Sequence, residues 1–319
     1  MLPLIAYGAA AATVTAAYSG KYQYANGFVD EWHAANEPSR PALVFVPGFL
    51  TEGRVLQRTD FPWHAPMLRY ADQHDLSLLA LHWRSSALRD LIVERDSPLM
   101  RTVAATANAT PALVKALAAL GLMKAVPPAS AFAVAATASV LALRIGLPVG
   151  VLLAGLKQWR SAVAEADRVG DDPANWFAAT SPLCDGAASR PLVFVGHSLG
   201  GRIVLRAAAV SSGLRVRRVV ALAAAVERTK TDLAGVARQC NQPPVIFHSR
   251  NDTVLNLLFR LGERTTSHAL GYNGSDDSSC RDVDFSLRQG SKVGHGTYST
   301  IVEDCLEQAL SADDLRSDR

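Results

Sequence analysis

The stretch "PLVFVGHSLGGRIV", residues 191–204, runs from a proline through four apolar residues into a Gly-His-Ser-Leu-Gly-Gly turn and then into residues typical of a helix. It matches the pattern G-x-S-x-G, with Ser198 at the centre. In a nucleophile elbow, a serine at a sharp strand-to-helix turn is lifted clear of the sheet, and small flanking residues permit that turn. An ordinary strand-helix turn is the alternative. Strand, motif and helix occur in the required order, so the stretch predicts an elbow with Ser198 as nucleophile.

Short apolar runs recur on both sides of this stretch and alternate with segments typical of helices. Continuous apolar runs predict strands that are buried on both faces. The expected strands are 42–46, 76–83, 191–195, 217–225 and 243–249, and the clearest expected helices are 202–212 and 252–262. This alternation predicts a mostly parallel sheet flanked by helices. In such sheets the ligand crevice forms at the carboxyl ends of the strands.

The residues that follow the later strands supply candidates for an acid and a base. Asp252 follows the 243–249 strand, and an aspartate there also suits a helix N-cap, so both roles are open. Asp284 is the rival acid, but it lies inside an expected strand. His295, between two glycines before an expected C-terminal helix, is the candidate base.

The other histidines fit the role of base less well. His197 lies in the elbow itself, His248 lies within a strand, and His268 has no glycine frame. Four more precede the serine in the chain, against the expected order of serine, acid and histidine. These are His33, His64, His74 and His82.

An oxyanion hole needs two backbone N–H groups, one of them from the residue after the nucleophile. Leu199 occupies that position. The second donor is expected from the loop after the first predicted strand, where Pro47-Gly48 precedes Phe49. We therefore predict the N–H groups of Leu199 and Phe49 as the pair, with an ordinary Pro-Gly turn as the alternative.

These residues resemble the α/β-hydrolase superfamily, with a closer resemblance to the family that includes transmembrane and coiled-coil domain-containing protein 4. The resemblance extends from about residue 40 to 310 and includes three Trp-bearing stretches. The matching stretches are "VPGFLTEG" (46–53), "DFPWHAP" (60–66), "LALHWRS" (79–85), "KQWRSAVAEADRVG" (157–170), "RPLVFVGHSLGGRIV" (190–204), "SRNDTVL" (249–255) and "VGHGTY" (293–298). The resemblance implies lipase-like or esterase-like chemistry, with membrane association in several members, and it fixes no substrate.

Two apolar segments decide the expected domain organisation. Residues 1–20 carry no charged side chain, and we expect 1–38 to be an apolar helical segment that either associates with a membrane or packs on the domain. The hydrolase domain then spans 39–319. Within it, 99–156 is an expected helical insertion, and "ASAFAVAATASVLALRIGL" (129–147) is apolar nearly all round. Two interpretations of this insertion stay open: a lid or membrane-docking region, and an added helical layer packed on the core.

Composition limits the classes of function. With 32 basic and 29 acidic residues, a net charge of +3 and no basic run, nucleic acid is not an expected partner. The four cysteines, at 184, 240, 280 and 305, show no metal-binding spacing and leave the redox compartment open.

The residues together predict a serine ester hydrolase that needs no metal or organic cofactor. A lipid or long-chain acyl ester is the expected substrate, with a membrane surface as partner and a membrane-associated or cytoplasmic location; secretion and the oligomeric state stay open. The alternatives are an esterase or thioesterase of small soluble substrates, and a non-catalytic protein of the same fold that binds a membrane or a partner.

Overall fold

The computed structural model describes residues 27–37, 39–49, 61–85, 149–178, 190–240, 242–287, 292–311 and 314–315. Residues 1–26 and 86–148, which contain most of the two apolar segments, lie outside these ranges. The predictions of an N-terminal membrane segment and of a lid therefore concern parts of the chain that the structure does not describe. No helix in the described ranges is long and apolar enough to span a bilayer.

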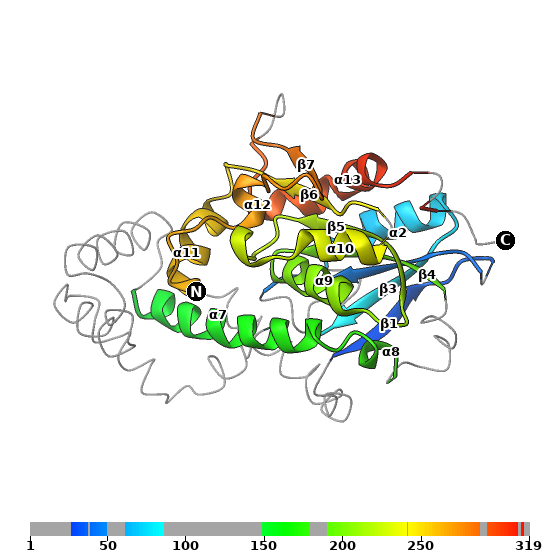
Figure 1. The fold of residues 1–319 in the computed structure, drawn as a ribbon, viewed down its shortest axis with the longest axis horizontal. Coiled ribbons are helices and arrows are strands. Elements are labelled where there is room, and N and C mark those ends of the chain that lie inside the picture. The colour runs from blue at the N-terminus through cyan, green and yellow to red at the C-terminus, as the bar shows by residue number, and fades with distance from the viewer. Residues whose placement is uncertain are drawn as a thin grey trace, which may run out of the picture.

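A seven-stranded sheet forms the centre of the molecule, in the order β1-β3-β2-β4-β5-β6-β7 (Figure 1). Among the strand pairs of the described residues, only β1 with β3 is antiparallel. Every residue of β2, β3 and β4 is buried, as expected for strands covered on both faces. The strands are β1 (Phe28–His33), β2 (Ala42–Val46), β3 (Ser77–His82), β4 (Pro191–His197), β5 (Arg215–Leu222), β6 (Val245–His248) and β7 (Arg281–Asp284).

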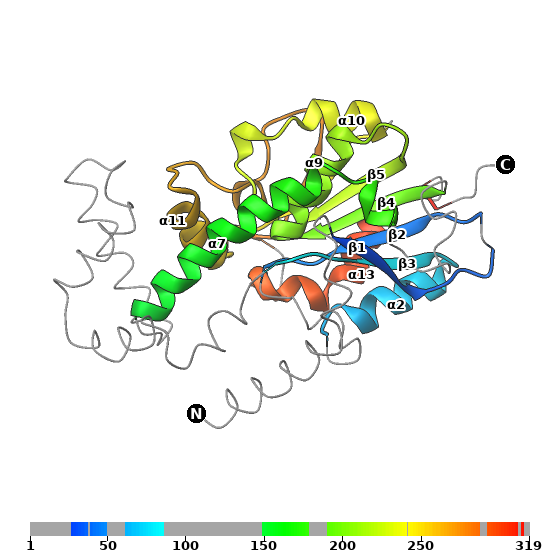
Figure 2. The ribbon, with the colours of Figure 1, turned by 90° about the horizontal axis from the view of Figure 1, so that it is seen from below.

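Helices cover both faces of this sheet. Figure 2 shows α7 (Val149–Gly170), α9 (Leu199–Val210) and α10 (Leu233–Cys240) on one side, and α2 (His64–Gln73) and α13 (Val302–Ala309) on the other. Shorter helical turns are α8 (Asn175–Ala178), α11 (Arg260–Glu263), α12 (Leu270–Asn273), η5 (Arg228–Lys230), η6 (Val254–Phe259) and η7 (His295–Thr300). The predicted fold class, a mostly parallel sheet flanked by helices with the α/β-hydrolase arrangement, is confirmed.

The prediction that 1–38 is helical is wrong for Phe28–His33, which forms β1. This strand lies at the edge of the sheet and pairs only with β3. A bulge between Glu31 and His33 leaves Trp32 without an opposite residue, so both Val29 and Trp32 turn into the core although they are three positions apart. The bulge disrupts the period of two by which an isolated strand is recognised.

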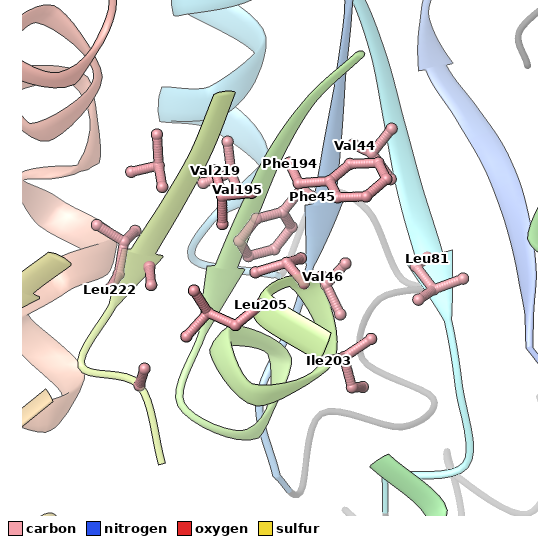
Figure 3. Close-up of a cluster of buried hydrophobic side chains, with 14 of the residues drawn as sticks. Val44, Phe45, Val46, Leu81, Phe194, Val195, Ile203, Leu205, Val219 and Leu222 are labelled. Carbon is pink, nitrogen blue, oxygen red and sulfur yellow. The ribbon is translucent and has the colours of Figure 1, made fainter. Parts of the chain in front are cut away.

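The core lies on both faces of the sheet. Figure 3 shows buried side chains of β2, β4 and α9 that form part of this core, among them Phe45, Phe194 and Ile203. The ring of Phe45 packs on Trp63 at the start of α2, with 5.1 Å between the centroids, whereas the ring of Phe194 packs on Trp176 of α8, at 5.4 Å. The helix α7 packs on α9 and runs without a break past residue 156, the predicted end of the insertion. Two hydrogen bonds from Arg202 to the carboxylate of Asp167, at 2.7 and 2.9 Å, join the helices.

The glycines of the G-x-S-x-G-G motif are required by close approach of backbone to backbone. A Cβ on Gly200 would lie 2.0 Å from the carbonyl oxygen of Val46, and one on Gly196 would lie 2.3 Å from the carbonyl oxygen of Gly200. A Cβ on Gly201 would lie 2.8 Å from that of Ala224. The start of α9 therefore packs directly on the end of β2 and on the segment that follows β5.

We expect Gly200→Ala to lower the free energy of unfolding by about 3 kcal/mol or more, because the methyl group has no room beside the backbone of Val46. Urea denaturation followed by circular dichroism measures the change. Gly296→Ala is the matched control, since a Cβ there meets no atom within 4 Å, and its effect is expected to stay below about 1 kcal/mol. Equal stability of the two variants would contradict the prediction.

Candidate active site

Ser198 occupies the turn between β4 and α9, as predicted from the motif. Its backbone angles, φ 56° and ψ −120°, are unusual for a residue other than glycine. The N–H of Ser198 donates to the carbonyl of Leu222 at 3.0 Å, and its own carbonyl accepts from Ala225 at 2.9 Å. Hydrogen bonds to the segment at the end of β5 therefore hold the turn on both sides of the serine.

The hydroxyl of Ser198 is buried, and it has no hydrogen-bond partner among the described residues. A buried polar atom without a partner is rare in folded proteins and calls for an explanation. A nucleophilic serine is activated by a hydrogen bond to its base, and the bond between Ser198 and His295 that the predicted roles require is not formed in this structure.

The structure brings Asp252 and His295 together. Nδ1 of His295 lies 2.7 Å from Oδ2 of Asp252, whose side chain is fully buried, whereas the side chain of His295 is 18% exposed. The carboxylate accepts from Nδ1–H in this arrangement, which leaves Nε2 of the same ring available to take a proton.

Asp252 makes the contacts that both of the roles left open by the sequence would require. Its second oxygen, Oδ1, accepts the backbone N–H of Leu255 at 2.9 Å, and its carbonyl accepts the N–H of Asn256 at 3.1 Å. The side chain thus caps the helical segment that contains η6 while it holds His295. Capping by one oxygen fixes the direction in which the other oxygen points.

The loop that carries Phe49 lies against Ser198. A Cβ on Gly48 would lie 2.8 Å from Cβ of Ser198, so only glycine allows this contact. The indole N–H of Trp83 donates to the carbonyl of Pro47 at 2.9 Å and so fixes the start of the loop. Phe49 follows, with its ring at 5.5 Å and 77° from that of Trp159 on α7.

Leu199 is the first residue of α9 and is fully buried. The first N–H groups of a helix have no intrahelical acceptor. The two residues predicted to form an oxyanion hole therefore lie on the two segments next to Ser198.

The alternative acid, Asp284, and two of the alternative histidines lie in different environments. Asp284 is the last residue of β7 and accepts the N–H of Ser286 at 2.7 Å. Its nearest histidine is His248, at the end of β6, with 3.8 Å between Oδ1 and Nδ1. Burial lowers the pKa of His248. His268 stacks on Tyr272, with 5.1 Å between the ring centroids.

Three tryptophans that contact the loops around the site were not predicted from the sequence. They are Trp83 beside Pro47, Trp159 beside Phe49, and Trp63, whose ring centroid is 4.7 Å from that of His197. A signal was available, since these tryptophans lie in the Trp-bearing stretches that carry the family resemblance.

Cysteine and metal chemistry have few candidates in the described part of the chain. Cys240, Cys280 and Cys305 are free thiols, and Cys184 lies outside the described residues. Burial raises the pKa of Cys240 to about 12, which disfavours a reactive thiolate. In the same ranges, no group of three His, Cys, Asp or Glu side chains is placed to hold a metal ion.

No protein-family model and no curated protein sequence matches this chain. Its structure is similar to that of LpqC, a poly(3-hydroxybutyrate) depolymerase from Bordetella parapertussis, with 14% identity, 90% of this chain and 86% of that chain covered, and a TM-score of 0.44. An esterase from Pyrococcus furiosus is 10% identical, with 89% and 91% covered and a TM-score of 0.34. MenH from S. aureus is also 10% identical, with 88% and 98% covered and a TM-score of 0.33.

Similarity at this level carries no information on activity, and the fold assignment rests on the strand order and on the elbow described above. The closer resemblance to the family that includes transmembrane and coiled-coil domain-containing protein 4 stays a prediction. The chain has the α/β-hydrolase fold, with Ser198, Asp252 and His295 all at the carboxyl ends of parallel strands or in the loops that follow them.

Proposed function

We propose that this protein is a serine ester hydrolase in which Ser198 is the nucleophile, His295 the base and Asp252 the acid that orients the base. The observation that carries the proposal is the 2.7 Å hydrogen bond between His295 and the fully buried Asp252; the strained backbone of Ser198 at the turn between β4 and α9 supports it. The three residues follow the chain order serine, acid, histidine of α/β-hydrolases.

The proposed reaction has two steps. Ser198 Oγ attacks an ester carbonyl while Nε2 of His295 takes its proton, and the N–H groups of Leu199 and Phe49 donate to the oxyanion. His295 then returns the proton to the leaving alcohol, and water, activated by the same ring, releases the acid. Asp252 stays ionised and stabilises the imidazolium that forms.

We propose a lipid or another long-chain acyl ester as the substrate, and a membrane surface as the place of reaction. The support is compositional. From residue 102 to residue 156, between β3 and β4, the chain has only three charged side chains. A segment that follows the sheet at its carboxyl edge can contribute to the ligand crevice, and an apolar one suits an acyl chain.

A fluorophosphonate probe tests the proposed chemistry, because it phosphonylates activated serines. The full-length protein is expected to be labelled at Ser198, as shown by mass spectrometry of the modified peptide. Folded wild-type protein that stays unlabelled, both in solution and with liposomes, contradicts the enzyme assignment and favours a binding protein of the same fold.

A substrate panel tests the lipid assignment separately. Phospholipids, glycerides and short-chain esters are offered with and without liposomes, and hydrolysis of a long-chain ester that rises with liposomes is the expected result. Faster hydrolysis of short soluble esters, with no effect of liposomes, would show that the lipid proposal is wrong while the serine hydrolase proposal holds.

A further inference from the structure

The side chain of His197, the residue before Ser198, contacts the backbone of the proposed base. Nε2 of His197 lies 3.0 Å from the carbonyl oxygen of His295. A carbonyl oxygen only accepts, so Nε2 of His197 carries the hydrogen and donates. The two imidazole rings also pack on each other, with 4.8 Å between their centroids.

The turn around His295 is anchored on its two sides by the fully buried Val293 and Tyr298, but its two glycines have few contacts. A Cβ on Gly296 would meet no atom within 4 Å, and one on Gly294 would meet atoms only at 3.9 Å. The hydrogen bonds of Gly294 with Thr297, at 3.1 and 3.2 Å, lie within the turn itself. Asp252 holds the ring of His295, and the bond from His197 fixes its carbonyl.

His197 also contacts the loop at residues 47–49, which carries one of the two proposed oxyanion donors. A Cβ on Gly48 would lie 3.2 Å from Nδ1 of His197, so the ring lies directly beside this loop. On another side it packs on Trp63. His197 is 7% exposed and is joined by one peptide bond to Ser198. One rigid ring therefore contacts the loop of Phe49 and the turn of His295 from a position fixed next to the nucleophile.

The ring of His197 is suited to this position because it stays uncharged. Burial holds the pKa of His197 well below its usual range, and the neighbouring His295 lowers it further. An uncharged ring does not oppose the positive charge that His295 gains when it takes the proton of Ser198.

We propose that His197 is a positioning residue, which sets the place of His295 relative to Ser198 through the hydrogen bond from its Nε2–H to the His295 carbonyl. The inference rests on the proposed function, since it assigns His197 a part in the reaction of Ser198. A proton-transfer step is sensitive to this distance, and a displacement of about 1 Å can cost roughly 100-fold in rate.

Two substitutions of His197 in the full-length protein separate the hydrogen bond from the packing. His197→Phe keeps a ring and removes the donor, whereas His197→Gln can place an N–H near the position of Nε2. Phosphonylation is expected to be about 10- to 100-fold slower in His197→Phe and to recover most of its rate in His197→Gln. His197→Met, which also lacks a donor, replaces His197→Phe if that variant does not fold.

Trp176→Phe is the matched control, because Trp176 is a fully buried ring that packs on Phe194 and contacts none of the residues named for the site. It is expected to lower the melting temperature and to leave the rate of phosphonylation unchanged. Amide hydrogen exchange in residues 292–300 provides a readout that does not depend on activity. Exchange there is expected to rise in His197→Phe and to stay near the wild-type value in His197→Gln.

Several outcomes overturn the inference. A wild-type rate in folded His197→Phe does so, and so do equal losses of rate in the Phe and Gln variants with unchanged exchange. Failure of the proposed function has a different signature, since the wild-type protein would then stay unlabelled. In that case His197 has no role in the reaction either, and the hydrogen-exchange data still show whether His197 holds the turn around His295.

Discussion

Replacing Ser198 with glycine is expected to abolish phosphonylation and, in the same molecule, to stabilise the fold. Loss of a nucleophilic serine typically lowers kcat by roughly 10⁶-fold. The gain in stability has a separate cause, because φ of Ser198 is +56° and side chains other than glycine rarely adopt such angles. Strain of this kind costs about 1–3 kcal/mol per residue, and glycine adopts positive φ freely.

The net gain in Ser198→Gly is expected to be on the order of 1 kcal/mol, because glycine also increases the entropy of the unfolded chain. Urea denaturation of both proteins measures it. Ser198→Ala is the control, since alanine removes the buried, unpartnered hydroxyl and keeps the strained backbone. Both variants should be unlabelled, with the glycine variant the more stable. A glycine variant less stable than the alanine variant would show that the elbow stores no strain.

Replacing Asp252 with asparagine is expected to lower the rate of phosphonylation by roughly 10⁴-fold while the fold stays intact. Asparagine keeps an oxygen that can accept the N–H of Leu255, so the cap persists. With that oxygen on the cap, the NH2 group of the asparagine faces Nδ1 of His295 and donates to it, which favours the wrong tautomer and does not stabilise the imidazolium.

Asp252→Ala separates the two roles of this carboxylate. The alanine variant should be equally slow and in addition lose about 1 kcal/mol of stability, because the cap is gone. Stopped-flow labelling and urea denaturation measure the two effects. Asp284→Asn is the matched control for the rival acid and should keep the wild-type rate. If Asp284→Asn were the slow variant and Asp252→Asn were not, the assignment of the acid would be wrong.

The central strands and the elbow were predictable because their signals are local. β2, β3 and β4 are buried on both faces, and such strands are continuous apolar runs that need no alignment or structure to recognise. The serine motif is local as a pattern too, although the crowding that requires Gly200 and Gly201 comes from Val46 and Ala224, which lie outside the motif. The position of Asp252 after β6 was predictable as well, because the loop after a parallel strand is where a candidate acid is expected; its role stays a prediction.

β1 shows where local signals fail. Its sequence, "FVDEWH", has charged residues in the middle and a bulge that places Val29 and Trp32 on the same face. An edge strand is held by one neighbour and by its packing, so its conformation depends on β3, nearly 50 residues later in the chain. Neither the bulge nor the pairing with β3 can be recognised from the six residues of β1 alone.

By itself the sequence determined the central strands, the glycine-flanked turn at Ser198 and the three residues proposed for the reaction, because apolar runs and motif spacing are visible within a few residues. Only the tertiary structure decided how those residues meet. The hydrogen bond of His295 with Asp252 spans 43 positions, and that with His197 spans 98. Such contacts depend on the direction in which each loop leaves the sheet, and this direction is set by packing against the neighbouring elements, as Gly48 and Trp83 illustrate.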